Sequence, residues 1–161
     1  MAEQFNNSIK ILFVCHGNIC RSPMAEFVMK DMVKRDGMED QFLIASAATS
    51  TEEIGNPVHR GTRNQLREHG IDPSGKRAVQ LRRSDYEKYD FLIGMDQWNM
   101  RQMERILGKD EEGKVFRLLD FTQSPGDIAD PWYTGDFDAT YRDVLRGCGA
   151  LLEYINKRSF M

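Results

Sequence analysis

An apolar run that ends in a turn-rich loop, followed at once by a helix pattern, constrains the fold more than any other feature. Ser8–Val14 has the length and the mostly apolar, β-branched content of a strand buried in a parallel sheet. Ser22 is placed to cap a helix, Pro23 suits its first position, and Gly37 lies just past its end. Within it, residues recur at helical spacing: Pro23, Met24, Phe27, Val28 and Met32. The sequence predicts a strand, a tight loop and a helix.

The same alternation continues along the chain. Further strands are predicted at Phe42–Ala45, Phe91–Met95 and Lys114–Leu118, and helices at Pro57–His69, ended by Gly70, and Asp96–Leu107, ended by Gly108. The final helix has the clearest apolar stripe, which consists of Tyr141, Val144, Leu145, Cys148, Leu151, Leu152 and Ile155. This order predicts an α/β fold, with a parallel sheet covered by helices on both faces and sites at the carboxyl ends of its strands. Asp120–Phe137 is long for a loop, and long ordered loops often carry function.

Length and charge restrict the class of protein. The 161 residues suit one domain, 1–161, in which we expect residues 1–7 to be flexible. The net charge of −3 provides no basic excess for nucleic acid. The longest early apolar run, Ile11–Cys15, is too short to span a bilayer, and no signal-peptide pattern precedes it, so we expect a cytoplasmic protein that binds no membrane. Three cysteines are too few for a disulfide scaffold and are expected to be thiols: Cys15, Cys20 and Cys148.

The segment Cys15–Ser22 carries the chemistry. Five residues separate Cys15, after the predicted strand, from Arg21 at the mouth of the helix. Gly17 and Asn18 tolerate the positive φ that turns successive backbone N–H groups inward, and such a nest at a helix N-terminus binds an oxyanion. The guanidinium of Arg21 suits two phosphoryl oxygens. This positive field favours the thiolate of Cys15, to which Ser22 can donate its hydroxyl, so we expect Cys15 to attack phosphorus and form a phosphocysteine.

Val14–Pro23 is similar to the signature of the low-molecular-weight protein tyrosine phosphatases, V-C-x-G-N-I-C-R-S-P. The similarity extends through Ser46–Ser50, Met95–Asn99, Asp130–Tyr133 and the final helix, and so covers nearly the whole chain. The resemblance implies a single three-layer domain with a four-stranded parallel sheet and helices on both faces. It also implies a cysteine-dependent enzyme that hydrolyses phosphotyrosine in a protein or peptide and releases inorganic phosphate.

Expelling a phenolate or alkoxide requires a proton donor. On the residues alone, Asp127, Asp130, Asp136 and Asp138 are equally plausible, and Asp130 before proline is also typical of a turn. The resemblance assigns Asp130 as general acid on the leaving group and then as general base on water. Neighbouring thiolate and phosphate charges favour its protonated form, so we expect activity to peak below neutrality and to fall on the alkaline side.

The resemblance also implies which residues surround the phosphate. Asn18 is expected to hold the loop in shape, with Ser22 and Ser46 in support. Cys20 resembles a family cysteine that forms a disulfide with the nucleophile on oxidation; alternatively, it is a small buried apolar residue. Cys148 lies on the apolar stripe and is expected to pack in the core. The expected phosphate-binding residues are His16, Gly17, Asn18, Ile19, Cys20, Arg21 and Ser22.

Two aromatic residues and two acidic residues are expected to border the substrate. Trp132 and Tyr133 suit an aromatic wall for a phenyl ring, with Ile19 as an apolar floor contact. On the residues alone the two aromatics also suit a hydrophobic plug under a long loop, and the family's use of this position favours substrate contact. Glu52, followed by Glu53, stands where many members carry an aromatic residue, which predicts an acidic opposite wall that binds acidic phosphopeptides poorly.

Other departures from the family pattern involve basic residues. Lys76 stands where the family often has a histidine, so we expect the usual histidine support of the loop to be missing. His16 either lines the pocket entrance or hydrogen-bonds at the surface, and the surface role is the simpler expectation. His59 and His69, on a polar helix, are expected to be solvated. No group of His, Cys, Asp or Glu has metal-ligand spacing, so no metal or cofactor is expected.

Three alternatives remain open. An arsenate reductase of the same fold needs resolving cysteines on a mobile segment, and Gly75–Tyr89 has none. Phosphoarginine phosphatases resemble the chain but carry threonine where Ile19 stands. A binding module would hold phosphotyrosine without turnover and would need Arg21 but neither Cys15 nor Asp130.

Overall fold

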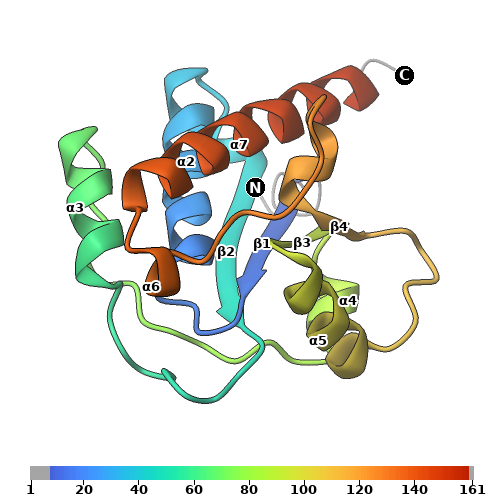
Figure 1. Cartoon of the computed structure of the whole chain (residues 1–161). Coiled ribbons are helices and arrows are strands. Elements are labelled where there is room, and N and C mark those ends of the chain that lie inside the picture. The colour runs from blue at the N-terminus through green and yellow to red at the C-terminus, as the bar shows by residue number, and fades with distance from the viewer. Residues whose placement is uncertain (1–7, 160–161) are drawn as a thin grey trace.

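Four parallel strands form the central sheet of the computed structural model, in the order β2-β1-β3-β4 (Figure 1). The structure describes residues 8–159. The predicted four-stranded parallel sheet is therefore confirmed, while the expected flexibility of residues 1–7 concerns residues outside those described. The strands are β1 (Ile9–Cys15), β2 (Phe42–Ala48), β3 (Phe91–Gly94) and β4 (Val115–Arg117).

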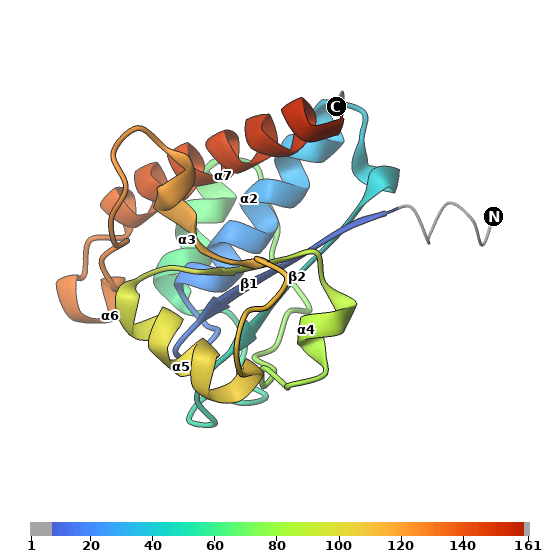
Figure 2. The same ribbon diagram turned by 90° about the vertical axis from the view of Figure 1, so that its right-hand side faces the viewer.

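Helices cover both faces of this sheet. Figure 2 shows α2, α3 and α7 on one side and α4 and α5 on the other, which confirms the predicted three layers. Within residues 8–159, no helix is long and apolar enough to cross a membrane. The α-helices are α2 (Arg21–Arg35), α3 (Arg60–Glu68), α4 (Asp85–Lys88), α5 (Gln97–Leu107), α6 (Pro131–Thr134) and α7 (Phe137–Ser159), and the 3-10 helices are η1 (Glu39–Gln41) and η2 (Leu118–Phe121).

Side chains along β1 alternate between two apolar cores. Ile11 and Phe13 belong to the core beneath α2 and α7, whereas Leu12 and Val14 belong to the core beneath α5. Burial of a side chain of this size contributes about 1.5–3 kcal/mol. Because both faces of the strand are covered, its sequence is continuously apolar instead of alternating.

Three predicted element boundaries are wrong for identifiable reasons. Strand β2 continues past Ala45 to Ala48 because its last three residues still pair with the end of β1. The helix predicted from Pro57 begins only at Arg60, since Pro57 forms an isolated bridge to Arg77. Helix α2 begins at Arg21, so Ser22 is not its N-cap.

The other predicted strands and helices with stated bounds lie within a residue or two of the observed ones. The final helix, predicted from its apolar stripe alone, extends over Phe137–Ser159. Helix α5 has a capping box between Asp96 and Asn99 and ends at Gly108, whose φ is 83°. In α7, Leu145 is exposed, so it does not belong to the buried stripe. The long loop at 120–137 contains the short helix α6.

Candidate active site

The site lies at the carboxyl end of the sheet, where β1 passes into the loop before α2. The loop is attached to the segment after β2 by two backbone hydrogen bonds, from Thr49 N to Cys15 O at 2.9 Å and from Ser50 N to His16 O at 3.0 Å. Asn18 has a φ of 58°, the left-handed conformation that its short polar side chain tolerates. Gly17 was expected to share this role, but its φ is not positive.

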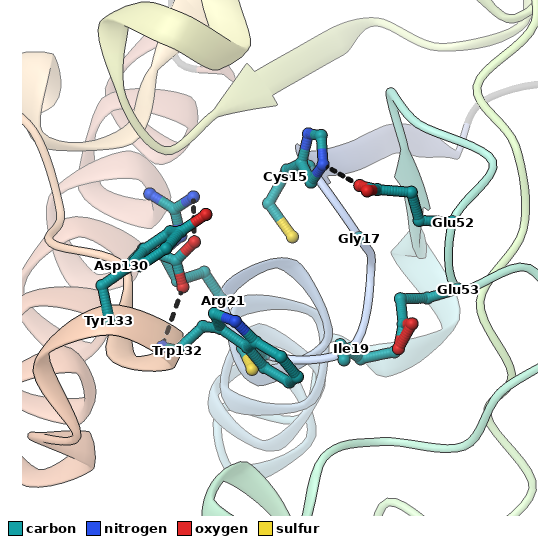
Figure 3. Close-up of a pocket in the computed structure, with 11 residues that line it drawn as sticks. Cys15, Gly17, Ile19, Arg21, Glu52, Glu53, Asp130, Trp132 and Tyr133 are labelled. Atoms are coloured by element: carbon teal, nitrogen blue, oxygen red, sulfur yellow. Dashed lines mark hydrogen bonds and ion pairs between the residues drawn. The ribbon is translucent and has the colours of Figure 1, made fainter.

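Cys15 opens onto a cavity of about 220 Å³, into which Figure 3 shows its sulfur pointing. Its Sγ lies 3.0 Å from Ser22 Oγ and accepts the backbone N–H of Ser22 at 3.4 Å. The Ser22 hydroxyl that was expected to cap α2 thus faces the sulfur. The cavity is lined by Cys15, His16, Gly17, Ile19, Cys20, Arg21, Glu52, Glu53, Asp130, Trp132 and Tyr133.

The buried side chain of Asn18 fixes the loop through three hydrogen bonds. Its Nδ2 donates to Ser22 Oγ at 2.8 Å and to Ser46 Oγ at 2.9 Å, while its Oδ1 accepts the backbone N–H of Val79 at 3.1 Å. Because Ser22 Oγ accepts from Asn18, the Ser22 hydroxyl hydrogen is left to donate to Cys15 Sγ. The buried amide therefore orients the serine beside the nucleophile candidate.

Arg21 is 2% exposed, and three oxygen atoms hold its guanidinium. Nη1 donates to Asp96 Oδ2 at 2.6 Å and to the Ile128 carbonyl at 2.8 Å, and Nη2 lies 3.4 Å from Asp130 Oδ2. Burial alone would lower the pKa of Arg21, but negative charge at Cys15 and the contact with Asp96 outweigh it, so the pKa is raised. Arg21 thus supplies a fixed positive charge at the cavity.

Lys76 occupies the place where the family often has a histidine that supports the loop. Its Nζ donates to the Ser46 carbonyl at 2.8 Å and lies 3.7 Å from Glu26 Oε1. Glu26, which is buried, also accepts from Ser46 Oγ at 2.6 Å and from Lys30 at 2.6 Å. Burial lowers the pKa of Lys76, and Glu26 opposes that shift. The histidine is therefore absent from this place, as expected, and a lysine–carboxylate pair occupies it instead.

Of the four aspartates considered as proton donors, Asp130 alone lines the cavity. Its Oδ1 accepts the backbone N–H of Trp132 at 3.0 Å, so it caps α6 as well as facing Arg21. Asp127 instead accepts from Gln97 N and Arg117, each at 2.9 Å. The last two aspartates bind elsewhere: Asp136 accepts the backbone N–H of Ala139, and Asp138 accepts from the side chain of Gln65.

Aromatic and acidic side chains stand on opposite sides of the cavity (Figure 3). Trp132 is 59% exposed and Tyr133 85% exposed, so Tyr133 does not plug the loop onto the body of the domain. Glu52 and Glu53 lie across from them, and Glu52 pairs with His16. The cavity thus has one aromatic and one acidic wall.

The two histidines that flank α3 differ in environment. His59 is half-buried between Trp132 and Phe137, so the prediction that it is solvated is wrong. His69 is exposed as expected, although its ring stacks on Tyr141 at 4.0 Å between centroids.

All three cysteines are free thiols and buried. Burial, with negative charge at Cys15 and Asp130, raises the pKa of Cys20 to about 12. Burial also raises the pKa of Cys148, which packs in the core. No group of three potential metal ligands occurs within residues 8–159.

The sequence analysis did not predict the contacts that three residues make around the site: Glu26, Lys76 and Asp96. One signal existed for Glu26, because it falls four residues after Ser22 on the buried side of α2. No local pattern marks the partners of Lys76 or Asp96, since their contacts join segments far apart in the chain.

Comparison with known proteins identifies a family. Residues 10–160 match the family model described as low molecular weight phosphotyrosine protein phosphatase. The chain is 38% identical over 151 residues to the low molecular weight protein-tyrosine-phosphatase YfkJ of Bacillus subtilis (strain 168), which covers 92% of this chain and 97% of that protein. It is 35% identical over 150 residues to PtpA of Staphylococcus aureus (strain MRSA252), and the match covers 92% of this chain and 95% of that protein.

Solved structures agree with this result. The crystal structure of YfkJ from Bacillus subtilis matches with a TM-score of 0.90 over 94% of this chain and 96% of that one. SP-PTP, a low molecular weight protein tyrosine phosphatase from Streptococcus pyogenes, matches with a TM-score of 0.80 at 40% identity. The match covers 91% of this chain and 92% of that one. The resemblance noted in the sequence is confirmed: the chain belongs to the low molecular weight phosphotyrosine protein phosphatase family, a family of hydrolases.

Proposed function

We propose that this protein hydrolyses phosphotyrosine through a phosphocysteine on Cys15, with Asp130 as general acid and then general base. One observation carries the proposal: a buried sulfur, a fixed guanidinium and a carboxylate border a single cavity. The loop N–H groups and Arg21 would bind the phosphate oxygens, which places phosphorus next to Cys15 Sγ. The unpaired thiols are consistent with action in the cytoplasm.

In the first step, the Cys15 thiolate attacks phosphorus in line with the departing oxygen. The S–P bond forms while the P–O bond to the tyrosine ring breaks, and its electron pair leaves on the phenolic oxygen. Protonated Asp130 gives that oxygen its proton, so the product leaves as a neutral phenol. Loop amides and Arg21 stabilise the charge on the equatorial oxygens.

In the second step, water displaces the sulfur. Asp130, now a carboxylate, takes a proton from water as its oxygen bonds to phosphorus, and the S–P bond breaks to restore the thiolate. The Ser22 hydroxyl, 3.0 Å from Sγ, stabilises the departing sulfur anion. Inorganic phosphate is the product, and Asp130 regains its acidic proton for the next cycle.

The cavity walls favour an aromatic phosphate ester. Trp132 and Tyr133 provide ring faces for a phenyl group, and Ile19 adds an apolar contact. An arsenate reductase has less support, because Cys148 is fully buried outside the cavity lining and Gly75–Tyr89 contains no resolving cysteine. A phosphoarginine phosphatase has less support because Ile19 replaces the threonine of those relatives.

The test is trapping of the covalent intermediate. Wild-type protein is mixed with p-nitrophenyl phosphate or a phosphotyrosine peptide, quenched in acid and digested, and the Cys15 peptide is examined by mass spectrometry for an added phosphoryl group. We expect the adduct in wild type and neither adduct nor turnover in Cys15→Ser. Cys148→Ala, which removes a thiol remote from the cavity, serves as the control. Peptide binding without turnover in the wild type would favour a binding module, and preferred turnover of a phosphoarginine peptide would favour that alternative.

A further inference from the structure

The start of α3 contacts the loop Cys15–Ser22, here called the phosphate loop, through two hydrogen bonds. The backbone N–H of His59 donates to the Ile19 carbonyl at 2.8 Å, and Thr62 Oγ1 donates to the Cys20 carbonyl at 3.1 Å. Both acceptors belong to the loop that follows Cys15. The first turn of α3 is therefore fixed relative to the nucleophile candidate.

The same turn also contacts the segment that carries Asp130, and Figure 1 shows α6 beside α3 and the start of α7. The His59 ring stacks on Phe137 with centroids 5.3 Å apart and planes 14° apart, and it meets Trp132 edge-on at 5.6 Å and 76°. His59 thus contacts both the loop after Cys15 and the segment 132–137, which lie more than 100 residues apart in the chain.

The His59 ring has little freedom to turn. Its Nδ1 accepts the backbone N–H of Gly61 at 3.0 Å, which makes the side chain the cap of α3. Phe137 lies so close that a Cβ on Gly61 would come within 2.3 Å of its ring, so only glycine leaves room for the stack. Cap and stack together fix the ring plane against which Trp132 rests.

Trp132 is in turn coupled to Asp130. Its backbone N–H donates to Asp130 Oδ1 at 3.0 Å, and the Asp130 carbonyl accepts from Tyr133 and Thr134 in the same short helix. A four-residue helix has little stability of its own, so its position depends on the contacts of its side chains. A displacement of the Trp132 ring would therefore move Asp130 with respect to Cys15 and Arg21.

We propose that His59 is a positioning residue for the proton donor: its ring holds Trp132 and, through α6, sets Asp130 at the cavity. The inference rests on the proposed function, since it assigns Asp130 its acid role. His59 does not touch the reacting atoms. It acts by keeping the acid within reach of the leaving oxygen, where small displacements cost rate steeply.

The experiment compares two substrates that differ in leaving group. p-Nitrophenolate departs without much protonation, whereas phenolate from phenyl phosphate needs the acid. In His59→Asn, asparagine can still cap the helix but lacks the ring. We expect kcat/KM for phenyl phosphate to fall about tenfold more than kcat/KM for p-nitrophenyl phosphate. Asp130→Asn should change the ratio of the two kcat/KM values in the same direction. In the double variant, His59→Asn should change this ratio no further.

His69→Asn is the matched control, because it removes a stacked histidine from the other end of the same helix. It should leave the substrate ratio at the wild-type value. An equal loss on both substrates in His59→Asn, or an equal ratio change in His69→Asn, would overturn the inference. If His59→Asn does not fold, His59→Phe and His59→Leu both lack the cap and differ in the ring. The ratio should then stay near wild type in His59→Phe and change in His59→Leu, and the absence of that difference overturns the inference.

Failure of the proposed function would look different. Active Cys15→Ser, or wild type inactive on both esters, would overturn the proposed function and the role of His59 with it. An Asp130→Asn effect on the ratio without a His59→Asn effect would overturn the role of His59 alone.

Discussion

Arg21 and Asp96 form a charged hydrogen bond of 2.6 Å that joins the phosphate loop to the start of α5. The other oxygen of Asp96 accepts the backbone N–H of Asn99 at 2.7 Å, so one carboxylate caps a helix and orients a guanidinium. Fixing the guanidinium before substrate arrives reduces the conformational entropy lost on binding phosphate. Its planar shape also lets it contact Asp96, the Ile128 carbonyl and the cavity at the same time.

Arg21→Lys should therefore cost far more than the loss of one hydrogen bond. A single ammonium cannot keep both fixed contacts and still bind two phosphoryl oxygens, so we expect kcat/KM for p-nitrophenyl phosphate to fall about 10²- to 10³-fold. Inorganic phosphate should also inhibit more weakly. Arg117→Lys is the control, since Arg117 pairs with Asp120 and Asp127 outside the cavity lining. Comparable losses in both variants would contradict this role for Arg21.

How far the sequence predicts the fold depends on where the determining contacts lie. The strand before Cys15 and the helix ended by Gly108 are specified by local patterns of burial and turn conformation, and the structure has both. The start of α3 is set instead by the bridge between Pro57 and Arg77 and by the contacts of His59. Those partners are distant in sequence, so no local rule predicts where the helix begins.

The same distinction applies to the site. Cys15, Arg21 and Ser22 lie within one short loop, so their meeting follows from the motif. Asp130 lies 115 positions after Cys15, so no local pattern distinguishes it from Asp127, Asp136 and Asp138, and only the family resemblance selects it. The Lys76–Glu26 pair was missed because a lysine in a polar segment is normally solvated, whereas this one is 12% exposed.

The acidic wall predicts a substrate preference. Glu52 and Glu53 border the cavity opposite the aromatic wall, so acidic residues next to phosphotyrosine would be repelled. In Glu52→Gln/Glu53→Gln, kcat/KM for a phosphotyrosine peptide with acidic flanks should rise about threefold relative to a neutral peptide, and less at high salt. Glu111→Gln/Glu112→Gln changes an exposed pair outside the cavity lining and should leave the preference unchanged. An unchanged preference in the first variant would remove the acidic wall from substrate selection.

Two glycines in α7 predict opposite effects on stability. A Cβ on Gly147 would lie 2.5 Å from Cγ of the buried Leu118, whereas a Cβ on Gly149 meets nothing within 4 Å. Gly147→Ala should lower the free energy of unfolding by about 1–3 kcal/mol through overpacking. Gly149→Ala should raise it by about 0.5–1 kcal/mol, because alanine loses less conformational freedom in a helix. Urea denaturation of both variants measures the difference, and equal effects would refute the packing of α7 on η2.

Alkylation should distinguish the two cysteines of the phosphate loop. Burial is the main cause that raises the pKa of Cys20, to about 12, so at pH 7 this thiol is almost entirely protonated. Iodoacetate reacts with thiolates, and we therefore expect the folded protein to be carboxymethylated first at Cys15. Phosphate, bound at the same loop, should slow the reaction. Peptide mass spectrometry measures which residue is labelled, and protein unfolded in urea, where all three cysteines should react, serves as the control. Preferential labelling of Cys20 in the folded protein at pH 7 would contradict the protonated state that its burial predicts.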